Sequence, residues 1–292
     1  MLLKVANLSK QAYYYAVKHL LDKDIKDQFY EDLILNIFEE NYQKYGVLRI
    51  TDALNAKLLS WKLPKINHKR VERIMKKLSI QARPKQRKYI SFKGDFGKKC
   101  NNLLLDKNLL ADKSLYVYKR NFETSGPYQK LGTDITMFIM PFGKLYLSPI
   151  IDFHTREILA YNLSKRPNYK QIERMFSELI KKHGNKIKGA VLHSDQGWQY
   201  QMDKYHKQII KLEMKQSMSR KGNCLDNSPT ENFFGRMKEE MFYGKEHLYK
   251  DMDSLIKAIV KYIEYYNDIR IINKFHMSPV AYKTKILASQ SL

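Results

Sequence analysis

Cysteine and long apolar runs are both scarce in this chain. Only two of its 292 residues are cysteines, Cys100 and Cys224, and they form neither a CxxC pair nor part of a His/Cys cluster with zinc-ligand spacing. We therefore expect free thiols in a reducing compartment. No apolar run approaches the roughly 18 residues of a membrane span, and Met1–Tyr15 lacks the apolar core of a signal peptide. These absences predict a cytoplasmic protein with no membrane partner.

Acidic residues are also few for a chain of this size. There are 30 Asp and Glu residues against 53 Lys and Arg residues, a formal net charge of +23. The basic excess extends through both halves of the chain and is not a tail. A polyanion is the simplest partner for such a protein, and nucleic acid is the commonest one. We expect a nucleoid-associated protein; a lysine-rich genome composition is the alternative explanation of the charge.

Residues 1–81 are expected to form a small helical domain. Apolar residues recur at helical spacing over Asp27–Tyr45, which Gly46 would end, and shorter helices are expected over Ile50–Leu59 and Asn67–Leu78. Asn67 is a good N-cap for the third helix, whose exposed face is basic. The basic residues that we expect to contact DNA there are Lys69, Arg70 and Arg73. A basic last helix is typical of a helix-turn-helix unit, although an ordinary amphipathic helix in a bundle has the same pattern.

Residues 82–125 are expected to be a basic linker. Ala82–Lys99 has seven basic residues and one acidic residue, contains scattered glycine, proline and serine, and has no periodicity. Such a segment is suited to lie along the phosphates of a nucleic acid.

Residues 126–245 change to an alternation of strands and helices. Three strand-like runs, LGTDITMFIM, KLYLSPIID and EILAYNLS, are followed by a helix over Tyr169–His183, the short apolar strand GAVLHSD, a helix over Tyr200–Leu212, a strand over Met214–Ser219 and a helix from Ser228. This order predicts an α/β fold, a mixed five-stranded sheet flanked by helices, and it matches a ribonuclease H-like fold. Residues 246–292, with a helix over Asp253–Asp268, are expected to be a helical extension that packs on this core.

Three acidic residues in this region are candidates for catalysis. Asp134 lies inside the first expected strand, Asp195 at the carboxyl end of the fourth, and Glu231 on the helix after the fifth. If the first and fourth strands are parallel neighbours, the two aspartates converge. Three carboxylates supply the oxygen ligands that Mg²⁺ prefers, and two such ions support in-line attack on a phosphodiester.

Glu231 also has a purely structural interpretation. The segment Ser228-Pro229-Thr230-Glu231 fits a capping box, with Ser228 as N-cap and Glu231 as its partner. Against this, Lys238 lies seven residues later, on the same helix face, where it could hold a DNA phosphate beside metal ions.

Several longer stretches together resemble a known family. LGTDIT, IIDFHTREILAYNLS, LHSDQGWQY, SMSRKGNCLDNSPTENFFGRMKEE and YYNDIRI…MSPVAY are similar to the integrase-like transposases of bacterial insertion sequences, in particular to the OrfB product of the family named for insertion sequence three. The resemblance covers most of the chain and includes that family's helix-turn-helix over Tyr42–Arg87. It implies the DDE core of retroviral integrases, with Asp134, Asp195 and Glu231 as the catalytic, metal-binding triad and Lys238 as the basic residue that follows the glutamate.

The resemblance also implies a reaction and its partners. Two Mg²⁺ ions, or Mn²⁺ as a substitute, would assist water in cleaving DNA and a DNA 3′-hydroxyl in strand transfer. The partners would be the element's terminal repeats, target DNA, further copies of the chain on DNA, and an upstream-frame product joined by frameshifting. The zinc-binding module of retroviral integrases is absent from the sequence. A ribonuclease H-like nuclease that only hydrolyses, and a DNA-binding repressor without catalysis, are the alternatives.

Seven more residues near these motifs have weaker signals. We expect Arg220 and Lys221 to touch DNA, and His193, two residues before Asp195 on its strand, to support the site from behind. Asp152 and Asp226 also lie in motif-like words, but a strand corner and a turn before the helix are their simpler roles. Trp198 and Tyr200 could stack on DNA bases, or be buried.

Overall fold

The computed structural model describes residues 9–82, 100–109, 116–220 and 223–290. The chain divides into two compact units, each described here by itself. The first comprises residues 1–84 together with 271–276, and the second comprises residues 85–270 together with 277–292. In the described residues, no helix is long and apolar enough to cross a membrane.

The first unit is helical. It contains α2 (Lys10–Glu40), α3 (Val47–Ser60) and α4 (His68–Lys77). Its core is formed by apolar residues from all three helices, and Ile34, Ile50, Leu54, Leu58, Val71 and Ile74 are fully buried there. The segment Ile271–His276 closes this unit: the backbone N–H of Ile271 donates to the Tyr45 hydroxyl, and Arg49 donates to the Asn273 side chain at 2.7 Å.

The expected end of the first helix at Gly46 is wrong. The helix ends at Glu40, because Tyr42 and Gln43 adopt left-handed backbone conformations with φ of 58° and 57°. The Gln43 N–H then donates to the carbonyl of Phe38. Gly46 is instead the N-cap residue of α3. The expected N-cap of α4 is confirmed, since the Asn67 side chain accepts the N–H of Lys69 at 2.9 Å.

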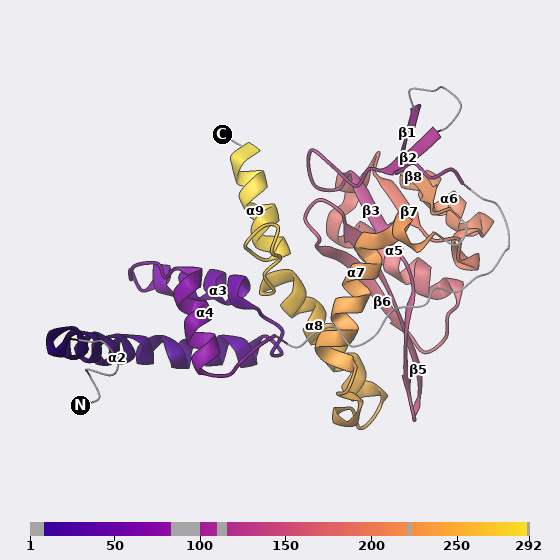
Figure 1. The fold of residues 1–292 in the computed structure, drawn as a ribbon. Coiled ribbons are helices and arrows are strands. Elements are labelled where there is room, and N and C mark those ends of the chain that lie inside the picture. Colours follow the sequence, from indigo (N-terminus) through magenta and orange to yellow (C-terminus); the bar gives the residue numbers. More distant parts are fainter. Residues whose placement is uncertain (1–8, 83–99, 110–115, 221–222, 291–292) are drawn as a thin grey trace. The chain divides into compact units, whose positions relative to one another are not determined.

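A mixed sheet forms the centre of the second unit (Figure 1). Its strands are β3 (Lys130–Thr133), β4 (Thr136–Met140), β5 (Gly143–Asp152), β6 (Ile158–Ser164), β7 (Val191–Ser194) and β8 (Lys215–Met218). β5 pairs antiparallel with β3, β4 and β6, whereas β7 pairs parallel with both β3 and β8. The expected ribonuclease H-like α/β fold is confirmed, with an antiparallel meander followed by parallel strands.

The sheet has six strands instead of the expected five, because the first expected strand is interrupted at Asp134 and Ile135. The register on β5 continues across the interruption: Thr133 pairs with Ile150 and Thr136 with Leu147. That register sets Asp134 opposite Pro149, which has no N–H to donate to the ladder. Asp134 therefore lies just beyond the carboxyl end of β3 and not in mid-strand, which corrects the sequence-based prediction.

The expected linker over residues 82–125 also contains paired strands. β1 (Leu105–Leu109) and β2 (Tyr116–Arg120) form an antiparallel two-stranded sheet, with Leu105 opposite Arg120. The adjoining segment is tied to the main sheet, since the N–H of Leu103 donates to the side chain of Ser217 on β8. The N–H of Asn121 donates to the Leu104 carbonyl. The linker prediction is thus wrong for this part; residues 83–99 lie outside the described residues.

Helices cover both faces of the main sheet. On one face, α5 (Tyr169–His183) and α6 (Asp203–Lys211) bury an apolar layer that includes Leu131, Met175 and Tyr205. On the other face lies α7 (Ser228–Met237), preceded by the short helix η3 (Cys224–Asn227) and followed by a π-helical turn, η4 (Lys238–Phe242).

The C-terminal helices complete the second unit. α8 (Met252–Asp268) contacts β6 and η4, and α9 (Pro279–Gln290) reaches the core through an ion pair between Lys283 and Glu157. Arg270 follows the end of α8 and is fully buried. Its guanidinium makes a bidentate contact with Glu240 of η4 at 2.6–3.1 Å. The Tyr262 hydroxyl donates to the same carboxylate at 2.6 Å. This paired and hydrogen-bonded charge fixes the turn that follows α7.

Glycine permits the close approach of α7 to the sheet. A Cβ atom at Gly132 of β3 would lie 2.4 Å from the Thr230 hydroxyl of α7 and 2.3 Å from the Phe153 ring. Since real Cβ atoms do not approach so closely, any side chain at this position would force helix and strand apart. Gly132 therefore sets how closely the start of α7, which precedes Glu231, lies against the end of β3, which precedes Asp134.

We expect Gly132→Ala to lower the free energy of unfolding by about 2 kcal/mol or more, since the added methyl group has no room without movement of α7. Thermal or urea unfolding measures the change. Gly126→Ala is the matched control, because the nearest atom to its added Cβ is at an ordinary 3.7 Å. Equal stability of the two variants would contradict the close approach.

Candidate active site

The parallel pairing of β3 with β7 brings Asp134 and Asp195 to the same edge of the sheet. Gly132 of β3 lies opposite His193 of β7, so the residues that follow the two strands leave the sheet side by side. Asp134 and Asp195 each come directly after a strand end. The charge of Asp195 raises the pKa of Asp134, so the two carboxylates lie within electrostatic reach of each other. The predicted convergence of the two aspartates thus has a structural basis.

Glu231 reaches this edge from the first turn of α7. Two contacts fix the start of that helix on β3: the Asn227 side chain donates to the Thr133 carbonyl at 3.2 Å, and Thr230 packs on Gly132. The capping-box interpretation is not supported, because the N-cap of α7 is Asn227 and no side chain caps the helix. η3 runs directly into α7, and the Ser228 N–H donates to the carbonyl of Leu225. Glu231 is therefore available for another role.

The three carboxylates influence one another electrostatically. Burial raises the pKa of Asp134 well above its usual value, and the charges of Asp195 and Glu231 raise it further, against an opposing hydrogen bond from the Ile135 N–H. Burial likewise raises the pKa of Asp195, although the Gly197 N–H donates to it at 2.9 Å. Burial, and then the charge of Asp195, raises the pKa of Glu231 to about 7. Desolvation together with like charges describes a site that lacks a compensating cation.

Lys238 is the cationic side chain that interacts with this group. It begins the π-helical turn after α7, is 9% exposed, and donates from Nζ to the carbonyl of Met137 on β4 at 2.8 Å. Burial lowers its pKa to about 8, while the charge of Asp134 opposes this shift. The ammonium also lies 5.3 Å from the centre of the Phe138 ring. Lys238 therefore lies near Asp134 at the start of a π-helical turn, whereas we expected it on the same helix as Glu231 and on the same face of that helix.

The chemistry of the donor set fits a hard cation. Three carboxylates offer oxygen ligands, and the raised pKa of each shows that additional positive charge there would be favourable. Within the described residues, no group of three or more His, Cys, Asp or Glu side chains is already gathered closely enough to hold a metal ion. Instead, Asp134 and Asp195 each accept a hydrogen bond from a nearby backbone N–H group through one carboxylate oxygen.

Comparison with known protein families gives matches along most of the chain. Residues 124–224 match one integrase core domain model and residues 231–287 match another, while residues 24–88 match an HTH-like domain. Among curated relatives, the putative transposase InsK of insertion sequence element IS150 from Escherichia coli K12 is 38% identical over 285 residues, which cover 97% of this chain and 93% of the relative. The chain belongs to the IS3 family of insertion-sequence transposases.

Two further similarities were found. A probable transposase of insertion sequence IS1353 from Shigella flexneri is 30% identical over 94% of this chain, a match that covers 50% of that relative. Among solved structures, the catalytic core domain of HTLV-2 integrase in complex with magnesium superimposes with a TM-score of 0.45 and 16% identity, over 55% of the transposase and 99% of the viral domain.

Asp226 has a different role from the turn that we expected. Its carboxylate is fully buried and accepts hydrogen bonds from the backbone and side chain of Arg220, from Arg120 at the end of β2, and from Asn102. Burial works to raise the pKa of Asp226, but the bonds from the two arginines outweigh it and lower the pKa to about 2. We call these four residues the Asp226 cluster. It ties the β1–β2 hairpin to the segment that leads into α7.

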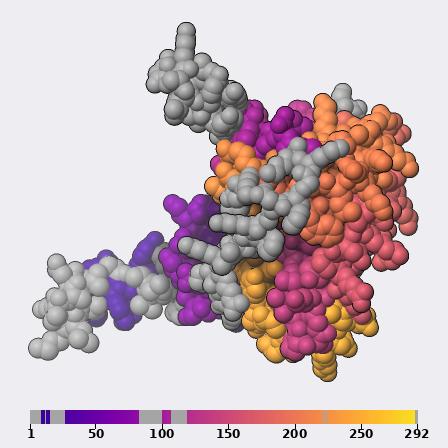
Figure 2. Space-filling view, turned by 90° about the vertical axis from the view of Figure 1, so that its right-hand side faces the viewer, coloured from indigo at the N-terminus to yellow at the C-terminus, as the bar shows by residue number. Residues whose placement is uncertain are grey.

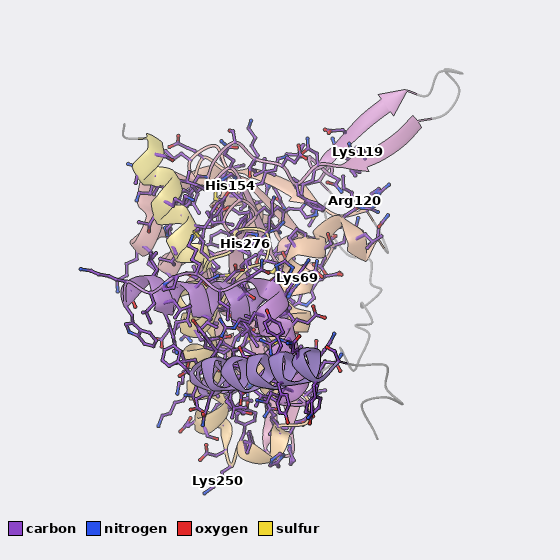
Figure 3. The ribbon with its side chains drawn as sticks, turned by 60° about the vertical axis from the view of Figure 1, so that its left-hand side comes forward. Lys69, Lys119, Arg120, His154, Lys250 and His276 are labelled. Atoms are coloured by element: carbon purple, nitrogen blue, oxygen red, sulfur yellow. The ribbon has the colours of Figure 1, made fainter. Side chains whose placement is uncertain are left out.

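The base of the β1–β2 hairpin is visible in two views. In Figure 2, purple residues near this base border orange residues of the second unit. Figure 3 labels Lys119 and Arg120, which lie together at that base; Arg120 enters the cluster, whereas Lys119 is exposed. Arg220, which we expected to touch DNA, therefore has a structural partner. Lys221 lies outside the described residues.

His193 is buried beside β8 and does not bond to the carboxylates. Its two ring nitrogens lie 2.8 and 3.0 Å from the hydroxyls of Ser217 and Ser219, and burial lowers its pKa to about 4. A neutral imidazole between two hydroxyls fixes the end of β8 next to that of β7. Asp152 is likewise structural, since it accepts the N–H groups of Tyr128, His154 and Thr155.

The basic residues of α4 differ in how their charges are used. Arg70 and Arg73 both pair with the fully buried Asp27 of α2, at 2.8 and 2.5 Å, which the helical pattern of the sequence could not reveal. Lys69 is exposed on α4 (Figure 3). Sequence reasoning also missed Gly132, Asn227 and Arg120; a glycine inside an expected strand was the one available signal of a close approach.

We expect Glu231→Gln to stabilise the metal-free transposase at alkaline pH. The folded-state pKa of Glu231 is raised from 4.5 to about 7, so the carboxyl adds no penalty below pH 4.5 and an increasing one as the pH rises through 7. Wild type should therefore lose stability across this window, by the order of 1 kcal/mol after allowance for the partial exposure of the side chain.

Thermal unfolding at pH 5 and pH 8, without divalent cations, measures this effect. The Glu231→Gln variant should show a smaller loss than wild type, and Mg²⁺ should stabilise wild type more than the variant. Glu173→Gln, on the exposed surface of α5, is the control. A pH dependence that is the same in wild type and in both variants would show that Glu231 is not destabilised by its surroundings.

We expect Arg120→Met to cost about 1–2 kcal/mol of stability at pH 7, because it removes one of the two cations that hold the buried Asp226. Lys119→Met, the neighbouring exposed cation, should change stability by less than about 0.5 kcal/mol. Urea unfolding compares the two. Equal effects would mean that Arg120 acts only through net charge.

Proposed function

We propose that this transposase cleaves and joins DNA by in-line attack on a phosphodiester, and that Asp134, Asp195 and Glu231 are its metal-binding catalytic residues. The observation that carries the proposal is the arrangement of three carboxylates, each with a raised pKa, from two parallel strand ends and one helix. When bound, two Mg²⁺ ions would supply activation of the attacking oxygen and stabilisation of the leaving oxygen, and Mn²⁺ is a substitute with similar ligand preferences.

The residues of the chain have separate tasks in this proposal. The carboxylates must be deprotonated to act as ligands, so Mg²⁺ binding competes with protons and should strengthen as the pH rises toward about 7, the pKa of Glu231 in the metal-free site. The anchors Gly132 and Asn227 hold the start of α7, and hence Glu231, against β3. Lys238 holds a positive charge beside Asp134, where it can balance the site and, by leaving the Met137 carbonyl, contact a DNA phosphate.

DNA is the proposed partner of both units. Lys69 on α4 is the candidate for a phosphate or base contact in the terminal repeats. Arg70 and Arg73 are about one-third exposed while they hold Asp27, so the exposed part of each side chain is accessible to target or element DNA. Arg220, at 37% side-chain exposure, is in the same position beside Asp226. The net charge of +23 supports a phosphate-dominated interaction that weakens with salt.

Further protein partners are part of the proposal. Joining two element ends requires more than one active site, so we propose a homo-oligomer on DNA. We also propose a functional association with an upstream-frame product, as a fusion. The IS1353 relative, half of which lies outside the match with this chain, supports the idea that this region works joined to another segment.

Asp134→Asn and Glu231→Gln should each lower DNA cleavage and joining by at least about 100-fold while the protein stays folded, because each removes a ligand charge without changing the shape of the side chain. The assay uses a labelled duplex that carries the element's own end, purified protein and Mg²⁺ or Mn²⁺. Glu173→Gln on α5 is the matched control and should retain wild-type activity.

The same assay separates the alternatives with a precut end that has a free 3′-hydroxyl. A joined product supports strand transfer, whereas a nuclease that only hydrolyses yields none. If wild type, both alone and fused to the upstream-frame product, neither cuts nor joins while binding the end tightly, the catalytic proposal is wrong and the DNA-binding interpretation replaces it.

A further inference from the structure

The turn that follows Asp195 is fixed unusually firmly for a surface segment. It is the single-turn helix η2 (Trp198–Tyr200). The Gly197 N–H donates to the Asp195 carboxylate at 2.9 Å, the Tyr200 N–H donates to the Gly197 carbonyl, and the Gln216 side chain donates to the Tyr200 carbonyl at 2.8 Å.

Two of the three side chains of η2 are buried beneath it. Tyr200 is fully buried, and its ring contacts that of Tyr205 on α6 with centres 5.3 Å apart. Burial raises the pKa of the Tyr200 hydroxyl, and the charges of Asp134 and Asp195 raise it further, so the base of the turn lies within electrostatic reach of both carboxylates. Gln199 is 9% exposed. The stacking role that the sequence left open for Tyr200 is therefore excluded by its burial.

Trp198 is the third side chain of η2, and 46% of its surface is exposed. A tryptophan is large enough that exposing it forfeits a considerable hydrophobic stabilisation. Here it is displayed three residues after Asp195, on a turn whose backbone is bonded to the Asp195 carboxylate itself. The backbone that carries this indole is thus held close to Asp195, and the exposed part of the ring is an apolar surface of the kind that stacks on unpaired bases in nucleic-acid proteins.

We propose that Trp198 is a base-stacking residue of the transposase, whose indole takes up the base next to the scissile phosphate when that base leaves its pair. The proposal rests on the proposed function only for the location of the scissile phosphate. Stacking would hold open the end of the duplex and orient the strand across the three carboxylates. It would depend little on base identity, because every base has an aromatic face.

The chain contains two tryptophans, which makes a direct test possible. In a Trp61→Phe variant, Trp198 is the one remaining tryptophan and gives the tryptophan fluorescence. In a Trp198→Phe variant, that fluorescence comes from Trp61 of the first unit. A duplex that ends with the element's own terminal sequence should strongly quench the fluorescence of Trp61→Phe. Replacing the stacked base by an abasic nucleotide, scanned over the last positions of each strand, should abolish the quenching at one position. Binding without quenching at any position would overturn the proposal.

Substitutions give a second, independent readout. Trp198→Ala should weaken binding of the intact end about tenfold and Trp198→Leu similarly, whereas Trp198→Phe should recover part of the loss. On the abasic duplex, wild type and Trp198→Ala should bind equally, which a merely structural role would not produce. Ile210→Ala, an exposed apolar residue of α6, is the control and should bind as wild type.

The outcomes also distinguish this inference from the catalytic proposal. Quenching by a wild-type site that never cuts or joins DNA would support stacking and contradict the proposed function. Normal cleavage and joining by Trp198→Ala, with no quenching in Trp61→Phe, would contradict stacking and leave the triad unaffected.

Discussion

The desolvation of three neighbouring carboxylates is the constraint on which the rest of the second unit depends. Burial raises the pKa of Asp134, Asp195 and Glu231, and repulsion by like charges adds to the shift at Asp134 and Glu231, so folding places these charges where they are less stable than in water. Local propensity cannot hold such a group; it must be imposed by contacts elsewhere in the fold. The sheet imposes two of the positions through the parallel pairing of β3 with β7, and α7 imposes the third.

The contacts that oppose this repulsion surround α7. Gly132 and Asn227 fix its start on β3, the Asp226 cluster fixes the segment before it, and the buried pair of Arg270 and Glu240 fixes the turn after it. None of these interactions neutralises the charges of Asp134, Asp195 or Glu231. The result is a rigid frame around a group of negative charges, an arrangement that favours a cation over further protein contacts.

The sequence was sufficient for the order of elements and for the two aspartates, because periodicity marks strands and helices and strand ends converge in a parallel pair. The sequence was insufficient where the conformation of a residue depends on a partner that is distant along the chain. Asp134 leaves the strand because of Pro149 on β5, and no local pattern around Asp134 shows this. The β1–β2 hairpin was missed because its strands are polar and lie in a basic segment. The predicted capping box is absent because η3 runs directly into α7, so Ser228 is not the N-cap residue of that helix.

Arginine and lysine have different uses in this chain, which changes how its charge of +23 should be understood. Arg70 and Arg73 hold the buried Asp27, Arg120 and Arg220 hold Asp226, and Arg270 holds Glu240. A planar guanidinium can serve a carboxylate through several N–H groups at once, which the compact ammonium of lysine cannot. Arginine therefore holds the buried Asp27, Asp226 and Glu240, whereas a lysine, Lys283, pairs with the buried Glu157. Much of the field that attracts DNA must come from exposed lysines such as Lys69 and Lys119. Basic residues chosen from the sequence alone mix these two classes, because burial of the acidic partner is what separates them.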